Sequence, residues 1–122
     1  MKILICDTLN RKVKEELQSL GECRDISSSE SKDQDLDLEI NEAEIVVVRS
    51  STQLTKELIE KGDNLKIIAR CGVGVDNIDV DYAKSKNIKV TNSPSANLIS
   101  VVELTVALII NAARKINLSD NH

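Results

Sequence analysis

Aromatic side chains are almost missing from this sequence of 122 residues, which has one Tyr and neither Phe nor Trp. A core can therefore be built only from aliphatic residues, and Ile and Val among them favour β-strands. Hydrophobic residues still make up 41% of the chain, which is enough for one core. The length is close to the commonest domain size of about 100–150 residues, so we expect one domain's worth of chain.

Long basic runs and long apolar runs are missing too. The formal net charge is −4, with no long run of Lys or Arg, which argues against a surface for nucleic acid or for an anionic membrane. No apolar run approaches the roughly 20 residues of a membrane span. The N-terminal MKILICD is too short for a signal peptide. We therefore expect a soluble, cytoplasmic protein that contacts neither nucleic acid nor membrane.

Cysteine and histidine are too few or too scattered for a metal site. Cys6, Cys23 and Cys71 are widely spaced and form no CxxC pair, a pattern that favours reduced thiols over disulfides or zinc ligands. Cys6 and Cys71 lie in apolar runs, as is typical of small core residues. His122 is the only histidine and ends the chain, where an imidazole lacks the orienting partner that acid–base catalysis needs.

What the sequence does contain is an alternation of strand-like and helix-like segments. Continuous apolar or β-branched runs predict five strands, at 2–6, 22–26, 44–50, 65–71 and 88–92. Helical spacing and capping residues predict helices at 10–21, 56–62, 81–87 and 100–116. The second has Thr52 or Thr55 as its cap and the third has Asp79. This order predicts an α/β protein with a flavodoxin-like, doubly wound parallel sheet of five strands, ending in a long interdomain helix.

One segment breaks the alternation. Residues 27–43 are polar and acidic, and Leu36, Leu38 and Ile40 are their only apolar anchors. We expect the first half to be a solvated loop, and we interpret its acids as a wet surface and not as metal ligands.

Polar residues and glycines follow three of the predicted strands. Arg49 and Ser50 end the third strand, Arg70 ends the fourth just before Gly72, Val73 and Gly74, and a loop containing Asn97 follows the fifth. Ligands of doubly wound sheets bind outside the carboxyl ends of the strands. We therefore expect these residues on one rim.

The glycine pair suggests an anion site of a particular kind. Gly72 and Gly74 are not followed by the third glycine of the dinucleotide fingerprint, because Val75, Asp76 and Asn77 come next. Exposed amides around them could instead form a nest for a small carboxylate, with arginine side chains binding a second anionic group. The plainer alternatives are a tight turn for the glycines, ordinary ion pairs for the arginines, and a loop-fixing role for Asn97.

Three stretches together carry a family resemblance, namely VVVRSST at 46–52, LKIIARCGVGVDNIDVDYA at 65–83 and IKVTNSPSANLISVVEL at 88–104. The chain resembles the N-terminal part of the D-isomer-specific 2-hydroxyacid dehydrogenases, and most of all the members that oxidise 3-phosphoglycerate. Small departures are Cys71, Asn87 in place of a common Gly, and Val102.

The resemblance implies roles for individual residues. The substrate carboxylate lies at Gly72, Val73 and Gly74, the phosphate end faces Arg49, Ser50 and Arg70, and Asn97 lines the cleft. It also implies a division into substrate-domain residues 1–99 and an interdomain helix with chain end at 100–122.

The same resemblance implies what this stretch does not hold. The NAD-binding Rossmann domain and the catalytic Arg, Glu and His of the family would lie beyond it, so we expect an inactive portion of a homo-oligomeric enzyme. The oligomer could form through the helix at 100–116. The competing hypothesis is a stand-alone acid-binding or subunit-interaction module without chemistry.

Overall fold

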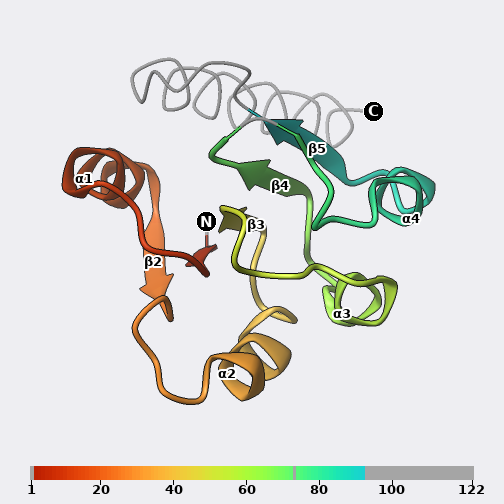
Figure 1. The fold of residues 1–122 in the computed structure, drawn as a ribbon, viewed down its shortest axis with the longest axis horizontal. Helices are drawn as coiled ribbons and strands as arrows, with labels where there is room; N and C mark the ends of the chain where they lie inside the picture. The colour runs from red at the N-terminus through yellow and green to blue at the C-terminus, as the bar shows by residue number, and fades with distance from the viewer. Residues whose placement is uncertain (1, 73, 93–122) are drawn as a thin grey trace, which may run out of the picture.

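The computed structural model describes residues 2–72 and 74–92, and every strand pair in it is parallel (Figure 1). The elements follow in the order β1 (Lys2–Ile5), α1 (Arg11–Leu20), β2 (Glu22–Asp25), α2 (Lys32–Glu39), β3 (Ile45–Val48), α3 (Lys56–Lys61), β4 (Ile67–Arg70), α4 (Val80–Ser85) and β5 (Lys89–Asn92). The strand order β2-β1-β3-β4-β5 is that of a flavodoxin-like doubly wound sheet. The predicted sheet is confirmed, whereas the predicted helix at 100–116 and the division at residue 99 lie outside the described residues.

Helices cover both faces of the sheet. Successive strand residues point to opposite sides, so each face has its own set of apolar side chains to bury. One face packs against α2, α3 and α4, and its buried members are Leu4, Cys6, Val46, Val48 and Ile68, with Leu36, Ile59 and Ala83 from the helices. The other face packs against α1, and its buried members are Ile3, Ile5, Ile45, Val47, Ile67 and Ala69, with Val13 and Leu17 from the helix. Burial on both faces explains why the strands read as continuous apolar runs.

Side-chain caps begin two helices where the sequence predicts them. Thr55 Oγ1 accepts a hydrogen bond from Leu58 N at 3.4 Å at the start of α3. Asp79 Oδ1 accepts one from Tyr82 N at 3.1 Å at the start of α4. Of the two threonines predicted as caps for α3, Thr55 is therefore the one that caps the helix, and Thr52 does not.

The helix α2 corrects the prediction of a solvated loop, because it begins at Lys32 within that stretch. Leu36 and Ile40 are buried four residues apart, as on a helix face, but Leu38 between them is 75% exposed. Alternation of the three apolar residues hides the helical period. Asp33 and Asp35 lie in the first turn, where negative charge stabilises a helix.

One backbone position has a conformation that few side chains adopt. Asn87, which precedes β5, has a φ of 62°, and Asn is among the residues that tolerate this left-handed region best. Glycine, which adopts this region without strain, would also suit this position.

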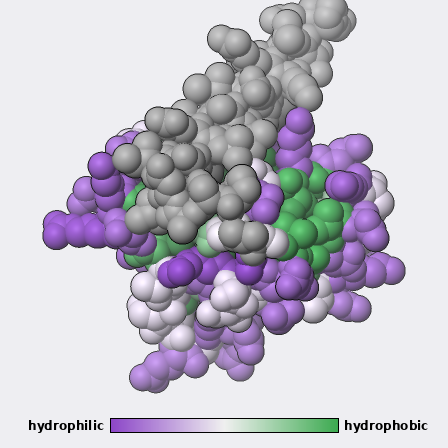
Figure 2. Space-filling model, turned by 45° about the horizontal axis from the view of Figure 1, so that its top comes forward, coloured by the Kyte–Doolittle hydropathy of each residue, from purple (hydrophilic) through white to green (hydrophobic). Residues whose placement is uncertain are grey.

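Hydrophilic residues dominate the molecular face in Figure 2, and the hydrophobic ones form smaller patches on it. In the part of the chain that the structure describes, no helix is long and apolar enough to cross a bilayer.

Candidate functional site

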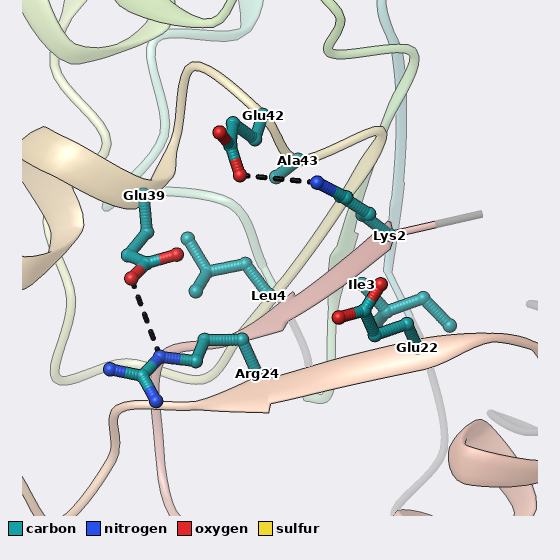
Figure 3. A pocket seen from close by; sticks show the side chains of 8 residues that line it. All are labelled: Lys2, Ile3, Leu4, Glu22, Arg24, Glu39, Glu42 and Ala43. Carbon is teal, nitrogen blue, oxygen red and sulfur yellow. Dashed lines mark hydrogen bonds and ion pairs between the residues drawn. The ribbon is translucent and has the colours of Figure 1, made fainter.

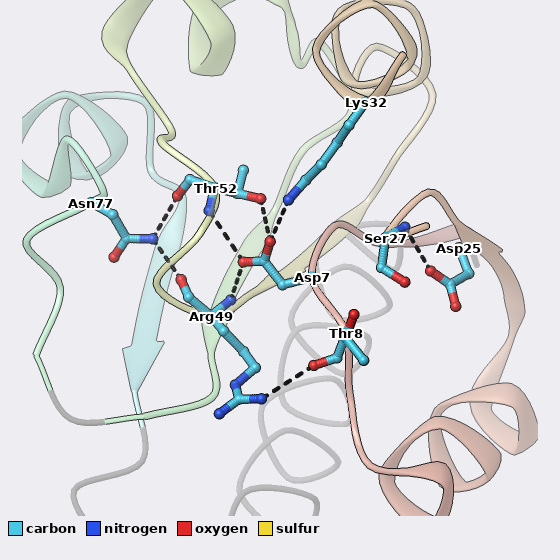
Figure 4. A network of polar contacts seen from close by, with 8 residues as sticks. All are labelled: Asp7, Thr8, Asp25, Ser27, Lys32, Arg49, Thr52 and Asn77. Carbon is cyan, nitrogen blue, oxygen red and sulfur yellow. Dashed lines mark hydrogen bonds and ion pairs between the residues drawn. The ribbon is translucent and has the colours of Figure 1, made fainter. Parts of the chain in front are cut away.

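The carboxyl ends of β1, β3 and β4 meet at one edge of the sheet, and a polar network connects the loops that follow them (Figure 4). Between β1 and β3 the chain path reverses, because β1 continues to β2 on one side and β3 continues to β4 on the other. Such a switch point is where doubly wound sheets bind ligands. The network therefore lies where a ligand site is expected.

Asp7 organises the β1 side of this network. Its side chain is 3% exposed, and its carboxylate accepts hydrogen bonds from Arg49 N at 2.6 Å, Thr52 Oγ1 at 2.6 Å, Thr52 N at 3.3 Å and Lys32 Nζ at 2.5 Å. Burial pushes the pKa of Asp7 upward, but the bonds from Lys32, Thr52 and the Arg49 amide outweigh it and hold the pKa below its ordinary value. Asp7 therefore stays ionised at neutral pH.

Asn77 organises the β4 side. This residue is 6% exposed, and its Nδ2 donates to the carbonyls of Arg49 and Thr52, each at 2.6 Å. Its Oδ1 accepts from Arg70 Nε at 2.8 Å, and its backbone carbonyl accepts from Leu54 N at 2.7 Å. The loop at 49–52 is thus held from both sides, its amides by Asp7 and its carbonyls by Asn77.

Arg70 shapes the glycine turn that follows β4. Its Nη1 donates to the carbonyl of Gly74 at 2.8 Å, and a Cβ built on Gly72 would lie 3.3 Å from the same nitrogen. Gly72 and Gly74 have φ angles of 152° and 88°, which L side chains rarely adopt. Among residues 2–72 and 74–92, the amides of these two glycines find no hydrogen-bond acceptor.

Arg49 and Ser50 remain exposed although their backbone is fixed. The guanidinium of Arg49 approaches the Thr8 carbonyl at 3.4 Å and forms no ion pair with any acid in the described part of the chain. Both residues line a hollow of about 390 Å³ at this edge. The full lining is Asp7, Thr8, Ser27, Lys32, Arg49, Ser50 and Ser51.

The structure brings most of the predicted site residues to one edge. Arg49 and Ser50 follow β3, while Arg70, Gly72 and Gly74 lie at the end of β4. Val73 and Asn97 lie outside the described residues. The roles of all seven in binding substrate remain predictions.

Sequence reasoning missed the residues that hold this edge together, namely Asp7, Lys32, Thr52 and Asn77. Asp7 lies two residues after the end of the buried strand β1, which is a usable signal because the carboxyl ends of strands carry ligand sites. No comparable signal marks Lys32, since its segment was not recognised as a helix.

A dinucleotide does not fit the glycine turn. The fingerprint needs a turn that opens directly into a helix, whose N-terminus receives the pyrophosphate. Here α4 begins only at Val80, and between Gly74 and that helix Ile78 forms a parallel bridge with Leu54. The turn therefore lacks the geometry of a dinucleotide site.

The thiols play no visible part in the network. Cys6 is completely buried in the core, and burial raises its pKa to about 12. Cys71 packs against the core on the other face of the sheet, and burial raises its pKa as well. The prediction that these two are free, core-packing cysteines is confirmed.

Comparison with known proteins assigns the chain to a family. The family model of the D-isomer specific 2-hydroxyacid dehydrogenase catalytic domain matches residues 3–116. The chain belongs to this family. It is 45% identical to D-3-phosphoglycerate dehydrogenase of Methanocaldococcus jannaschii, over 95% of this chain and 22% of that protein.

Two further matches show the breadth of the likeness. The chain is 43% identical to hydroxypyruvate reductase of Thermotoga maritima, over 94% of this chain and 37% of that protein. The NAD⁺-bound crystal structure of 3-phosphoglycerate dehydrogenase from Entamoeba histolytica superimposes with a TM-score of 0.60 at 28% identity, over 75% of this chain and 32% of that one. The chain thus spans about a fifth to two fifths of the length of these relatives.

Proposed function

We propose that this chain is the substrate-domain portion of an NAD-dependent D-2-hydroxyacid dehydrogenase, and that its substrate is 3-phosphoglycerate. The product would be 3-phosphohydroxypyruvate, which starts serine synthesis. Support comes from the family membership and from the D-3-phosphoglycerate dehydrogenases among the relatives. The cytoplasmic location and the homo-oligomeric state expected from the sequence belong to the same proposal.

The observation that carries the proposal is the mutual fixing of two loops at the switch point. Asp7 and Asn77 hold the loop at 49–52 from opposite sides, and Arg70 holds the glycine turn. Donors fixed in advance bind an anion without the cost of ordering the loops. The arrangement fits a small acid that is bound at two points.

Each end of the acid has its own donors in this proposal. The amides of Gly72 and Gly74 bind the carboxylate, while the guanidinium of Arg49 and the hydroxyl of Ser50 bind the other end. Arg70 contributes by positioning the turn through Gly74 and Asn77. NAD, the cofactor of the proposed whole enzyme, would be held by residues other than this turn.

A binding measurement on the 122-residue chain tests the substrate site. We expect 3-phosphoglycerate to shift the amide NMR signals of Gly72, Gly74 and Ser50, and Arg49→Ala to weaken its binding by about 1.5–3 kcal/mol, as for a lost charge-assisted hydrogen bond. Arg24→Ala is the matched control, because Arg24 is an exposed arginine of β2 paired with Glu39. Unchanged affinity in Arg49→Ala would remove Arg49 from the site.

The catalytic part of the proposal requires the protein expressed from the complete reading frame. NAD-dependent oxidation of 3-phosphoglycerate is the expected activity, and the 122-residue chain alone should leave NADH fluorescence unchanged. If the complete protein turns over neither 3-phosphoglycerate nor any other D-2-hydroxy acid, while the short chain still binds the acid, the alternative of a binding module without chemistry is correct.

A further inference from the structure

The strand β2 is the last strand on its side of the sheet (Figure 1). It pairs with β1 along one edge, and no strand of the described chain pairs with its other edge. Backbone N–H and C=O groups point alternately to the two sides of a strand. The amide of Ile26 donates to the carbonyl of Ile5, so the backbone groups of Cys23 and Asp25 point away from β1.

These outward groups are open to a further strand. Natural edge strands are protected from such pairing by a covering element, a proline, a bulge or charged side chains. The sequence of β2 contains no proline, and the strand keeps a regular register with β1 over its whole length. Charged side chains therefore decide which strands can pair with this edge.

The two exposed charges on the edge have opposite signs and lie close together. Glu22 and Arg24 are two residues apart, so their side chains extend from the same face of β2 (Figure 3). The Nε of Arg24 lies 3.4 Å from Glu39 in the same chain, and the guanidinium has further N–H donors on its two terminal nitrogens. The edge therefore attracts a strand that carries the two charges in reverse order.

A second copy of β2, running antiparallel, presents that reverse order. When the twofold axis passes through Cys23, Glu22 of each copy lies opposite Arg24 of the other, which gives two pairs of opposite charge. The two Cys23 residues then exchange backbone hydrogen bonds as in an antiparallel ladder. Asp25 lies opposite Gly21, whose extended backbone, with φ 177° and ψ −172°, continues the ladder without a side chain beside the carboxylate.

The other symmetric registers within β2 are unfavourable. An axis at Glu22 or at Arg24 places that residue opposite its own copy, and an axis at Asp25 places two carboxylates opposite each other. An axis between two residues pairs an outward-facing residue with an inward-facing one, which breaks the ladder. Charge and backbone geometry thus select the register centred on Cys23.

We propose that the outer edge of β2 is an interface between two copies of this chain, joined as antiparallel strands about a twofold axis at Cys23. The pairs of Glu22 with Arg24 fix the register, and the two sheets continue into one another. The inference goes beyond the proposed function and does not depend on it, because neither Arg49 nor the glycine turn takes part.

Reversal of single charges tests the interface and its register. Glu22→Arg and Arg24→Glu each place like charges opposite each other in both pairs, so each should weaken dimerisation of the 122-residue chain by about 10-fold or more. The double variant Glu22→Arg/Arg24→Glu restores opposite charges and should restore the dimer. Sedimentation velocity at low salt, where exposed charges are screened least, measures the dissociation constants.

A mixture of the two single variants sharpens the test. Glu22→Arg and Arg24→Glu have complementary edges, so together they should form a heterodimer although each associates poorly with itself. The net charge of the chain is −4, and one reversal changes it by two units. Both variants therefore stay negative, and overall attraction does not account for a heterodimer.

Two controls separate the interface from effects on folding. Glu39→Gln removes the partner of Arg24 within the chain and should not weaken the dimer. Hydrogen exchange of the unmodified chain, followed by NMR, needs no substitution. The amides of Cys23 and Asp25 should become protected as the protein concentration rises, whereas those of Glu22 and Arg24, which face β1, should be protected at every concentration.

Three outcomes would overturn the proposal. The first is a chain that stays monomeric at about 1 mM, where even a weak interface forms. The second is a dimer that is insensitive to charge reversal at Glu22 and Arg24, since another surface, such as the predicted helix at 100–116, would then join the copies. The third is a double variant that stays as weak as the single ones, because the register centred on Cys23 would then be wrong.

Discussion

The two edges of the sheet carry charged side chains in very different surroundings. At the amino edge, Lys2 pairs with Glu42 at 3.2 Å, and the two side chains are 50% and 64% exposed (Figure 3). This pair borders a small hollow of about 90 Å³. At the carboxyl edge, Asp7 is 3% exposed and accepts four hydrogen bonds (Figure 4).

The difference lies in how many partners each group has and whether water competes for them. An exposed one-to-one ion pair contributes about 0–1 kcal/mol, because solvent screens it and two flexible side chains must be ordered. A buried carboxylate has no water to replace a lost partner, so breaking its bonds is costly. Polar groups at the amino edge can therefore be exchanged, whereas those at the carboxyl edge act together.

This contrast bears on function because the buried groups hold backbone. Asp7 binds the amides and Asn77 the carbonyls of the loop that begins at Arg49. These hydrogen bonds from Asp7 and Asn77 hold the backbone of the loop in place. The exposed side chains of Arg49 and Ser50 therefore extend from a fixed backbone. At the amino edge the ion pairs between Lys2 and Glu42 and between Arg24 and Glu39 join side chains only. The side chains that do hold backbone there, Asn41 and Asn64, make exposed hydrogen bonds.

The largest effect is expected for Asp7→Ala. The substitution leaves Lys32 Nζ, the Thr52 hydroxyl and two backbone amides without their acceptor, so the free energy of unfolding should fall by about 3–5 kcal/mol. Glu42→Ala, which breaks the exposed pair with Lys2, should cost less than about 1 kcal/mol. Urea denaturation followed by circular dichroism measures both, and similar losses in the two variants would remove the contrast between the edges.

A smaller loss is expected for Asn77→Ala. Two carbonyls and the Nε of Arg70 lose their partner at a site that is nearly closed to water, so the cost should be about 2–3 kcal/mol. The control is Asn41→Ala, because Asn41 also donates two hydrogen bonds, to Lys61 O and Asp63 Oδ2, but lies exposed. A loss in the control as large as in Asn77→Ala, again from urea denaturation, would show that burial is not what matters.

Much of the fold can be predicted from the sequence, because strands that are buried on both faces have continuous apolar sequences. The run Ile45–Val48 is apolar at every position, and the caps Thr55 and Asp79 mark helix starts by local chemistry that needs no tertiary contact. The helix α2 was missed because its stability comes from packing Leu36 and Ile40 against the sheet, and exposed Leu38 obscures that pattern.

The candidate site was predictable in position but not in its internal bonding. The topology alone places residues after β3 and β4 at one edge, and the arginines and glycines stand there. Which atoms pair is a question of geometry. Arg70 turns its Nε to Asn77 and one Nη to Gly74, and Lys32 reaches Asp7 from a helix that begins far along the chain. Such contacts join segments that are distant in sequence, and a single sequence contains no pattern from which they can be predicted.

The smallest expected effect is the part of the Asp7 contribution that depends on pH, and it is measured with Asp7→Asn because asparagine keeps the shape and one acceptor oxygen. The pKa of Asp7 is lowered from its ordinary value of 3.8, the bonds from Lys32, Thr52 and the Arg49 amide outweighing the upward effect of burial. A lowered carboxyl pKa stabilises the fold fully above the ordinary value, and this stabilisation is lost as the pH falls through the lowered value. Asparagine does not titrate, so the gap in unfolding free energy between the unmodified chain and Asp7→Asn should be constant from pH 7 to about pH 5 and should narrow below about pH 4. Urea denaturation at a series of pH values measures the gap, and a gap that stays constant down to pH 2 or widens on acidification would mean that the ionised carboxylate of Asp7 is not what holds the loop.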